Sequence, residues 1–154
     1  MALTRFYADE VRSGQYPYLR YDDQERWHLR LYRDRRVDIW LISWLPSQGT
    51  QLHDHGGSAG ALTVVGGELS EAVFVPAGRG AGSLRERILS DGRSVGFDAA
   101  YVHDVSNASA APAASVHAYS RPLTSMTFYD LQDGRLARLG SLATEDPEPE
   151  FDGR

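Results

Sequence analysis

The chain has 154 residues, of which 42% are hydrophobic and 24% charged, and its formal net charge is −5 at pH 7. This length allows one domain with a hydrophobic core, and the negative charge argues against nucleic acid as a partner, because phosphate binding depends on clustered cations. The sequence has no cysteine, which excludes disulfides, thiolate metal sites and a cysteine nucleophile. There is no signal peptide and no apolar run of about 20 residues, so we expect a cytoplasmic protein without a membrane partner.

The predicted elements are one helix followed by many short strands. Residues 1–14 have apolar side chains at helical spacing, and we expect a helical segment at 1–26 that packs on the body. Runs of strand-forming residues follow, separated by turn residues. The expected strands are 29–32, 37–44, 51–55, 61–65, 71–75, 95–97, 115–120, 125–131 and 136–142. We expect loops at 76–82 and 107–113, and an acidic tail at 144–154 that is mobile or lies on the surface.

This spacing of strands is typical of an all-β protein. With one short helix at the start, it predicts an antiparallel β-barrel or jelly roll in which residues 1–154 form a single domain. Polar side chains that point into such a barrel are unusual unless they hold a ligand.

The histidines are the most informative residues of the chain. His53 and His55 form an H-x-H pair, and His103 opens an H-x-x-x-N motif that ends at Asn107. Residues two apart on a strand point to the same face. The pair can therefore present two imidazole nitrogens to one cation at about 2.0–2.2 Å, with His103 as a third ligand. An isolated pair is more often a surface or hydrogen-bonded pair, but here glycine-containing turns flank it, which favours a metal site at a strand end.

A further motif, S-x-H-x-Y, consists of Ser115, His117 and Tyr119. On a strand these three side chains share one face and can form a hydrogen-bonded relay. Ordinary strand alternation produces the same pattern, so the motif gains weight only beside the metal-site motifs.

Together these motifs resemble the cupin superfamily and, within it, the cysteine dioxygenase type I family. The positions that match the two cupin motifs are His53, His55 and Gly67 in the first, and His103 and Asn107 in the second. Gly60 stands where most cupins have a glutamate ligand. Without that carboxylate three histidines are left, and this ligand set resembles that of the thiol dioxygenase branch, in which three histidines bind iron. The resemblance covers roughly residues 27–131.

The resemblance implies a cupin jelly-roll barrel with Fe(II) held by His53, His55 and His103. It implies O2 as co-substrate and L-cysteine as the thiol, whose sulfur receives both oxygen atoms to give cysteine sulfinic acid. Tyr119, oriented by His117 and then Ser115, would hydrogen-bond the oxygen or the substrate carboxylate, and these three are the candidate catalytic residues.

Two departures from the family pattern are visible. Mammalian members cross-link the relay tyrosine to a cysteine, and Gly60 occupies the position of that cysteine, so no thioether can form, which resembles bacterial members. The family usually has Ser-Pro-Pro with a cis peptide before the first proline, whereas this chain has Ser120, Arg121 and Pro122. We expect a trans bond before Arg121, because a non-proline cis peptide costs about 2.5–4 kcal/mol.

A small thiol acid also needs a cation for its carboxylate, ideally the bidentate fork of an arginine. Cysteine dioxygenases have this arginine on an early strand, and the 3-mercaptopropionate branch has a glutamine instead. An ungapped alignment back from Trp44 places His28 there, and a small shift in the hairpin at Asp34 places Arg30 there. We favour Arg30, with Arg121 as the next candidate. Either arginine could instead form a surface salt bridge.

Three alternatives to a cysteine dioxygenase stay open, of which the first changes only the substrate. The substrate could be 3-mercaptopropionate or another small thiol acid, the protein could be a cupin metalloenzyme acting on a non-thiol substrate, or it could be a sensor without catalysis. The ligand set favours iron, with nickel, cobalt and zinc as alternatives. We expect a monomer or a weak homo-oligomer.

Overall fold

The computed structural model describes residues 1–78, 80–147, 149 and 151–152. These residues form one helix, α1 (Ala2–Arg12), and eleven strands. The strands are β1 (His28–Arg33), β2 (Asp38–Trp44), β3 (His53–Asp54), β4 (Ala59–Gly66), β5 (Glu68–Gly78), β6 (Ala81–Ser90), β7 (Ser94–Phe97), β8 (His103–Ser106), β9 (Ala113–Ser120), β10 (Ser125–Gln132) and β11 (Arg135–Ala143). The predicted all-β architecture with a short N-terminal helix is confirmed.

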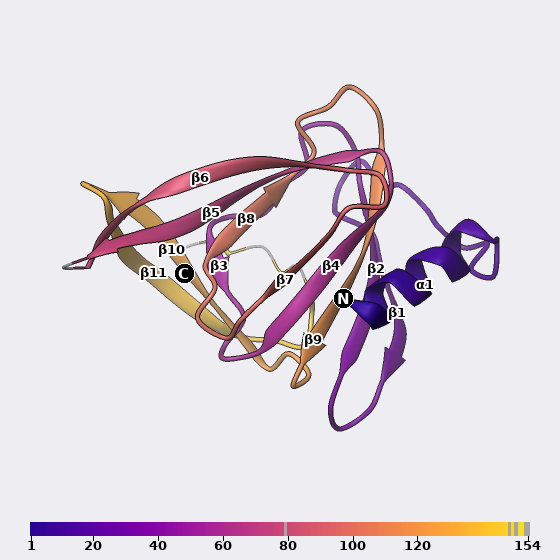
Figure 1. The fold of residues 1–154 in the computed structure, drawn as a ribbon, viewed down its shortest axis with the longest axis horizontal. Coiled ribbons are helices and arrows are strands. Elements are labelled where there is room, and N and C mark those ends of the chain that lie inside the picture. Colours follow the sequence, from indigo (N-terminus) through magenta and orange to yellow (C-terminus); the bar gives the residue numbers. More distant parts are fainter. Residues whose placement is uncertain (79, 148, 150, 153–154) are drawn as a thin grey trace.

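The strands form two antiparallel sheets that face each other (Figure 1). One has five strands in the order β1-β2-β9-β4-β7, and the other has six in the order β11-β10-β3-β8-β5-β6. Chain neighbours such as β3 and β4 lie in different sheets, so the chain repeatedly crosses from one sheet to the other. This arrangement brings side chains that are far apart in the sequence into one enclosed interior.

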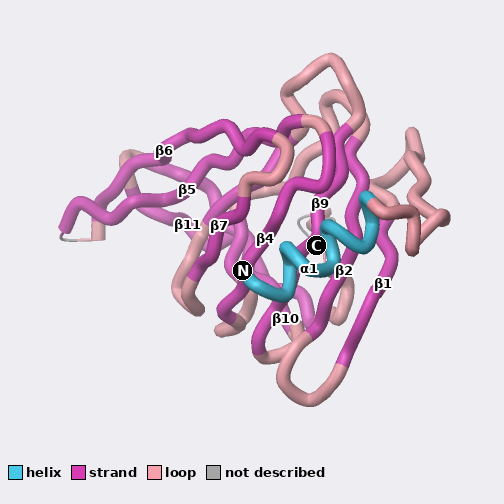
Figure 2. The backbone as a smooth tube through the Cα atoms, turned by 45° about the vertical axis from the view of Figure 1, so that its right-hand side comes forward, coloured by secondary structure: helices cyan, strands magenta, loops and turns pink. Residues whose placement is uncertain are grey.

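The core has two parts. The larger part lies between the sheets and contains buried side chains such as Trp44, Leu62 and Phe128. The smaller part lies between α1 and the outer face of the five-stranded sheet, where Ala8 and Val11 of the helix pack. Figure 2 shows α1 lying along β4, β9 and β2 on that outer face. Burying each aliphatic side chain contributes about 1.5–3 kcal/mol, which explains why this segment has apolar residues at helical spacing.

Two expectations about the strands are corrected. The expected strand 51–55 is only the two-residue β3, and the expected loop 76–82 is largely strand, because β5 and β6 form one long hairpin. Most side chains of β6 are exposed or only partly buried, so the strand lacks the apolar alternation by which it could have been predicted.

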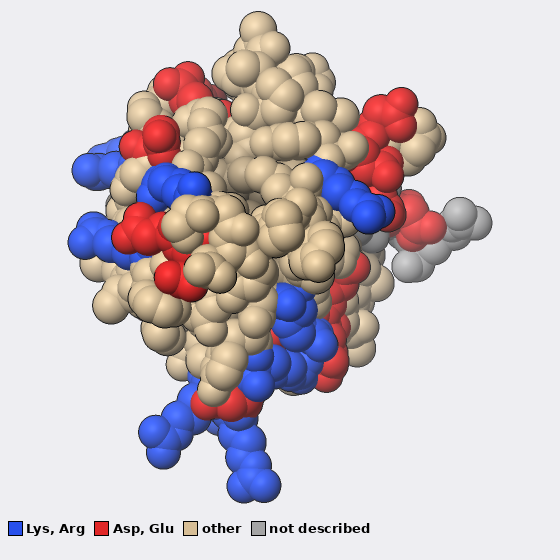
Figure 3. Space-filling model, turned by 90° about the vertical axis from the view of Figure 1, so that its right-hand side faces the viewer, with Lys and Arg blue, Asp and Glu red and all other residues tan. Residues whose placement is uncertain are grey.

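The acidic tail also differs from the expectation. Pro147 is buried, and the partly buried ring of Phe151 packs against the core between the sheets, so these two tail residues do not simply lie on the surface. The β1–β2 turn carries the exposed Arg35 and Arg36. Arginine side chains project from that end of the face shown in Figure 3, with acidic side chains beside them. The described residues contain no helix with the length and hydrophobicity needed to cross a membrane.

Candidate metal centre

Three histidines meet in the interior of the barrel. β3 and β8 are neighbours in the six-stranded sheet, and their register pairs His53 with His103. The Nε2 atom of His55 lies 3.2 Å from Nε2 of His53 and 3.4 Å from Nε2 of His103. All three side chains are at most 2% exposed. The structure therefore brings the three predicted ligands together around one point, within 4.8 Å of one another.

The hydrogen bonds of His53 and His103 fix which nitrogen of each ring can bind a metal. The Nδ1 atom of His53 lies 2.7 Å from the carbonyl oxygen of Gln51, and Nδ1 of His103 lies 2.8 Å from a carboxylate oxygen of Glu71. Both oxygens accept hydrogen bonds, so each Nδ1 carries the hydrogen and each Nε2 presents a lone pair. Burial, and then the neighbouring histidine charges, lower the pKa of His53 and His55 well below the usual range. The Nε2 lone pairs of His53 and His103 therefore face Nε2 of His55 inside the barrel, and three imidazole nitrogens at these distances fit a transition-metal ion.

The side of the centre near β4 is filled by an aromatic ring. Gly60 lies opposite Tyr119 in the β4–β9 register, and a Cβ atom at Gly60 would collide with the ring of Phe97 and the carbonyl oxygen of Ala118. The Phe97 ring stacks on His55, with 4.8 Å between ring centroids and 20° between planes. A fourth side-chain ligand at position 60 therefore has no space in this protein.

We expect Gly60→Ala to lower the free energy of unfolding by about 1–3 kcal/mol, the usual cost of overpacking a core. Adding Phe97→Leu should recover only part of the loss, because the Ala118 carbonyl remains in place. Gly66→Ala is the matched control on the same strand, since a Cβ there meets nothing within 4 Å. Urea unfolding measures all three variants, and unchanged stability of Gly60→Ala would contradict this account of the site.

The second predicted group, on β9, forms a chain of hydrogen bonds that begins at a residue not identified from the sequence. The Nε1 atom of Trp44 donates to the Ser115 hydroxyl at 2.9 Å, and this hydroxyl lies 2.9 Å from Nε2 of His117. The Nδ1 atom of His117 lies 3.4 Å from the hydroxyl of Tyr119. Trp44, Ser115 and His117 are all buried.

The direction of the hydrogens along this chain follows from the donors. An indole N–H can only donate, so the Ser115 oxygen accepts from Trp44 and its hydroxyl donates to Nε2 of His117. Burial lowers the pKa of His117 to about 3, so the ring is neutral at neutral pH and carries its hydrogen on Nδ1, toward Tyr119. The Tyr119 hydroxyl thus receives one hydrogen bond from His117 and donates its own hydrogen to the carbonyl oxygen of Pro147, at 3.5 Å. Its ring lies 5.1 Å from the ring of His55, which places this donor group beside the metal centre.

A buried acidic residue, Glu71 on β5, supports His103 from behind. One oxygen of Glu71 accepts from Nδ1 of His103 and, at 3.1 Å, from the hydroxyl of Tyr101, while the other accepts from Nε of Arg87 at 2.6 Å. Burial raises the pKa of Glu71, but the hydrogen bonds from His103 and Arg87 outweigh burial and leave the pKa lowered. Sequence reasoning missed Glu71. The available signal was its position, because a carboxylate at the start of the expected strand 71–75 needs a partner if that strand is buried.

The predicted substrate-binding residues lie in two different places. Arg30 and His28 are on β1, and both lie against the indole of Trp40, at 4.3 Å for the guanidinium carbon and 5.4 Å for the imidazole centroid. Trp40 is the cross-strand partner of His117, so this face of β1 continues the face that carries the relay. Arg121 is exposed and lines a surface pocket with residues 56–58 instead.

The peptide bond between Ser120 and Arg121 is cis, so the expectation of a trans bond there is wrong. That expectation rested on the local preference of the peptide unit alone.

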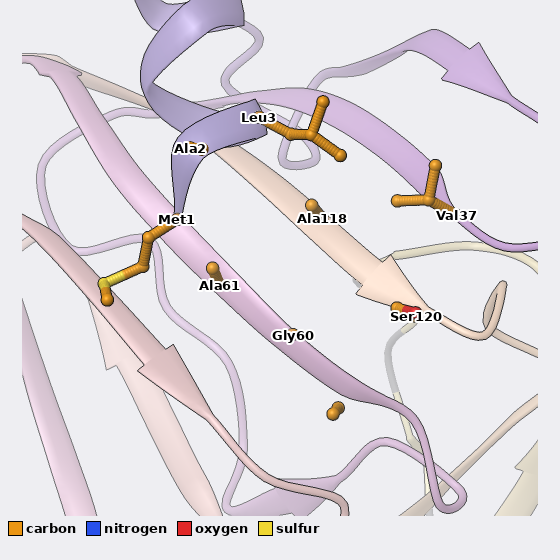
Figure 4. Close-up of a pocket in the computed structure, with 9 residues that line it drawn as sticks. Met1, Ala2, Leu3, Val37, Gly60, Ala61, Ala118 and Ser120 are labelled. Carbon is orange, nitrogen blue, oxygen red and sulfur yellow. The ribbon is translucent and has the colours of Figure 1, made fainter.

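Another pocket lies beside the end of β9, between the start of α1 and the outer face of the five-stranded sheet (Figure 4). Its lining side chains are apolar apart from Ser120, and the relay lies on the opposite face of the sheet, so the side chains of this pocket offer no ionisable group for chemistry.

Comparisons with known proteins agree with this fold and site. The model of the family described as cysteine dioxygenase type I matches residues 2–132. Among solved structures, TT1209 from Thermus thermophilus has a TM-score of 0.57 at 25% identity, over 68% of this chain and 91% of that chain. A cupin superfamily protein from Desulfitobacterium hafniense has a TM-score of 0.54 at 13% identity, over 66% and 83%.

A third solved structure, a conserved protein with a double-stranded β-helix domain from Klebsiella pneumoniae, has a TM-score of 0.53 at 18% identity, over 79% of this chain and 90% of that chain. The likenesses below 25% identity concern the fold alone, and they agree with the predicted cupin barrel.

Proposed function

The chain belongs to the cysteine dioxygenase type I family, and from this premise we propose that it is an Fe(II)-dependent thiol dioxygenase that adds both atoms of O2 to the sulfur of L-cysteine. A three-histidine site in a member of this family indicates a metal-dependent cupin enzyme. The observation that carries the finer proposal is the relay on β9, which ends at Tyr119 beside the ring of His55.

In this proposal Fe(II) is held by the Nε2 atoms of His53, His55 and His103. Fe(II) bound there supplies open coordination positions and a positive charge that lowers the pKa of a thiol. Because all three ligands are neutral imidazoles, they leave the charge of the ion uncompensated, which favours an anionic thiolate. Glu71 holds the ring of His103 in its orientation through the hydrogen bond to Nδ1.

The other residues orient the reactants and control water. Tyr119 would donate its hydroxyl hydrogen to the reacting oxygen in place of the Pro147 carbonyl that accepts it in the structure, since His117 already donates to the Tyr119 oxygen. Burial of Tyr119 and the ligand histidines keeps bulk water away from this hydrogen bond and strengthens it. Arg30 binds the carboxylate of the substrate from β1. In the net reaction a thiol and O2 combine into a sulfinic acid, and the electrons lost by sulfur are those gained by O2, so no external reductant enters.

The test is oxygen consumption by protein loaded anaerobically with Fe(II), with L-cysteine and 3-mercaptopropionate offered in parallel. Saturable uptake that yields a sulfinate supports the proposal. A preference for 3-mercaptopropionate would change the substrate but keep the reaction class. Uptake with neither thiol would overturn the proposal and leave a cupin metalloenzyme of different chemistry.

We expect Tyr119→Phe to bind Fe(II) like the unmodified protein and to turn over about 10- to 100-fold more slowly, because a positioned proton donor contributes at least this much. The matched control is Tyr129→Phe, which removes a hydroxyl that donates to Asp54 at 2.7 Å outside the relay. Metal content and initial rates of oxygen uptake distinguish the two variants. Equal rates for Tyr119→Phe and the control would remove Tyr119 from the mechanism.

A further inference from the structure

The chain beyond β11 closes one end of the space between the two sheets. Its last ladder bond joins the amide of Thr144 to the carbonyl of Thr124, and the segment then leaves the sheet. We call the described residues Glu145, Asp146, Pro147, Pro149 and Phe151 the C-terminal strap. In Figure 1 the yellow end of the chain runs between the sheets.

The strap contacts both sheets. The carbonyl oxygen of Pro147 lies 3.5 Å from the Tyr119 hydroxyl of the five-stranded sheet. The ring of Phe151 stacks on Phe128 of the six-stranded sheet, with centroids 4.9 Å apart and planes 11° apart. Phe128 in turn lies 6.2 Å from the ring of His53. The strap therefore lies across the relay tyrosine and next to one side of the metal centre.

The charged end of the strap rests on two arginines of β1, Arg30 and Arg33, which we call the arginine pair. Glu145 forms a bidentate ion pair with Arg33 at 2.7 and 2.8 Å, and one of its oxygens lies 3.7 Å from Arg30. A second carboxylate also faces the pair. It belongs to Asp38, which is fully buried, 3.3 Å from Arg30 and 3.7 Å from Arg33.

These charges leave room for one further anion at the arginine pair. A buried carboxylate needs a cation beside it, so Asp38 permanently compensates one of the two guanidinium charges. The second charge is compensated by Glu145, whose side chain is 60% exposed. If Glu145 moved away, the pair would present one net positive charge and a bidentate donor surface, which is the arrangement that binds a carboxylate.

This carboxylate position lies beside the relay. Asp38 is the cross-strand partner of Tyr119, and two residues of the same strap, Glu145 and Pro147, contact the arginine pair and the Tyr119 hydroxyl. A small thiol acid that contacted both the Tyr119 hydroxyl and Arg30 would meet these two strap residues, because Pro147 contacts the first and Glu145 the second. Substrate and strap therefore compete for these contacts.

We propose that Glu145 is a specificity-determining residue: its carboxylate occupies the substrate-carboxylate position on the arginine pair, and a thiol acid binds only by displacing it. The proposal rests on the proposed thiol dioxygenase function. A thiol without a carboxylate has no need of the arginine pair and gains nothing when Glu145 is neutralised. The strap thus weakens the binding of thiols that have a carboxylate and leaves the binding of other thiols unchanged.

The kinetic test compares 3-mercaptopropionate with 2-aminoethanethiol, which has no carboxylate, on the Fe(II)-loaded full chain. In Glu145→Gln the ratio of kcat/KM for the first thiol to that for the second should rise about two- to fivefold, the range expected for loss of a partly exposed ion pair. The control is Glu25→Gln, an exposed residue whose change removes the same charge elsewhere. An unchanged ratio, or equal gains with both thiols, would overturn the proposal.

A second measurement separates this proposal from the proposed function. Propionate binding to the full chain, followed by NMR titration without metal or thiol, should be about two- to fivefold tighter in Glu145→Gln than in Glu25→Gln, with shifts at the amides of β1. If no thiol is oxidised but propionate binding tightens in this way, the dioxygenase function fails and the competition at the arginine pair stands. If thiols are oxidised but propionate binding is the same in both variants, the strap proposal alone fails.

Discussion

Replacing His53 with alanine is expected to weaken Fe(II) binding by more than about 100-fold and to abolish oxygen uptake with any thiol. Loss of a residue that only supports a ligand costs about 10- to 100-fold in metal affinity, and His53 is itself one of three converging donors. Its Nε2 atom lies 3.2 Å from that of His55, so its removal leaves two donors and an unfilled gap. Anaerobic Fe(II) titration and metal analysis of the purified protein measure the effect.

The control for this variant is His28→Ala, which removes an imidazole at the rim that lies outside the three-histidine group. This control should retain the metal content of the unmodified protein. Circular dichroism should show the same strand content in both variants, because the buried His53 is neutral and its loss leaves no unpaired charge. Full metal occupancy in His53→Ala would contradict the proposed ligand set.

Glu71→Gln is expected to lower metal affinity about 10- to 100-fold and to destabilise the fold as well. The carboxylate of Glu71 accepts from three donors, on His103, Tyr101 and Arg87. A glutamine of the same shape has one accepting oxygen, and its amide group would face a donor on the other side. Whichever way the amide turns, either His103 or Arg87 meets another N–H group inside the protein, and an unsatisfied buried donor costs about 1–3 kcal/mol.

Two readouts separate a positioning role of Glu71 from a purely structural one. Fe(II) affinity should fall even at temperatures where Glu71→Gln is fully folded, and the electron paramagnetic resonance spectrum of a nitrosyl probe bound to the Fe(II) protein should change with the orientation of His103. Glu68→Gln, at the exposed start of the same strand, is the matched control. If Glu71→Gln lowered thermal stability but left the spectrum and the metal affinity as in the control, its role would be structural only.

The parts of this protein that were predictable from sequence depend on short-range geometry. His53 and His55 share a strand face because they are two residues apart, and the same rule aligns Ser115, His117 and Tyr119. The helix at the N-terminus was predictable because its apolar residues recur at helical spacing, although Leu3 and Phe6 are exposed and only part of this set packs on the sheet. In each case the pattern within a few residues contains the relevant physical information.

The parts that were not predictable depend on contacts between distant segments. Glu71 meets His103 across 32 positions of sequence, and Trp44 meets Ser115 across 71. A glutamate or a tryptophan on an expected strand does not indicate which partner it will have. The placement of the tail has the same origin. Its composition is acidic and contains two prolines, which predicts a mobile or surface segment, while Phe151 packs on the core and Glu145 pairs with the distant Arg33.

The shortness of β3 has a consequence for the way the barrel holds together. This two-residue strand links β10 to β8 in the six-stranded sheet, with two residue pairs on one side and one on the other. A metal held by His53 and His103 would link the two halves of the sheet at β3, where the strand pairing is shortest. Ion binding would then raise the free energy of unfolding, because a ligand that binds only the folded state stabilises it. Without the ion, the sheet would be expected to separate first along β3.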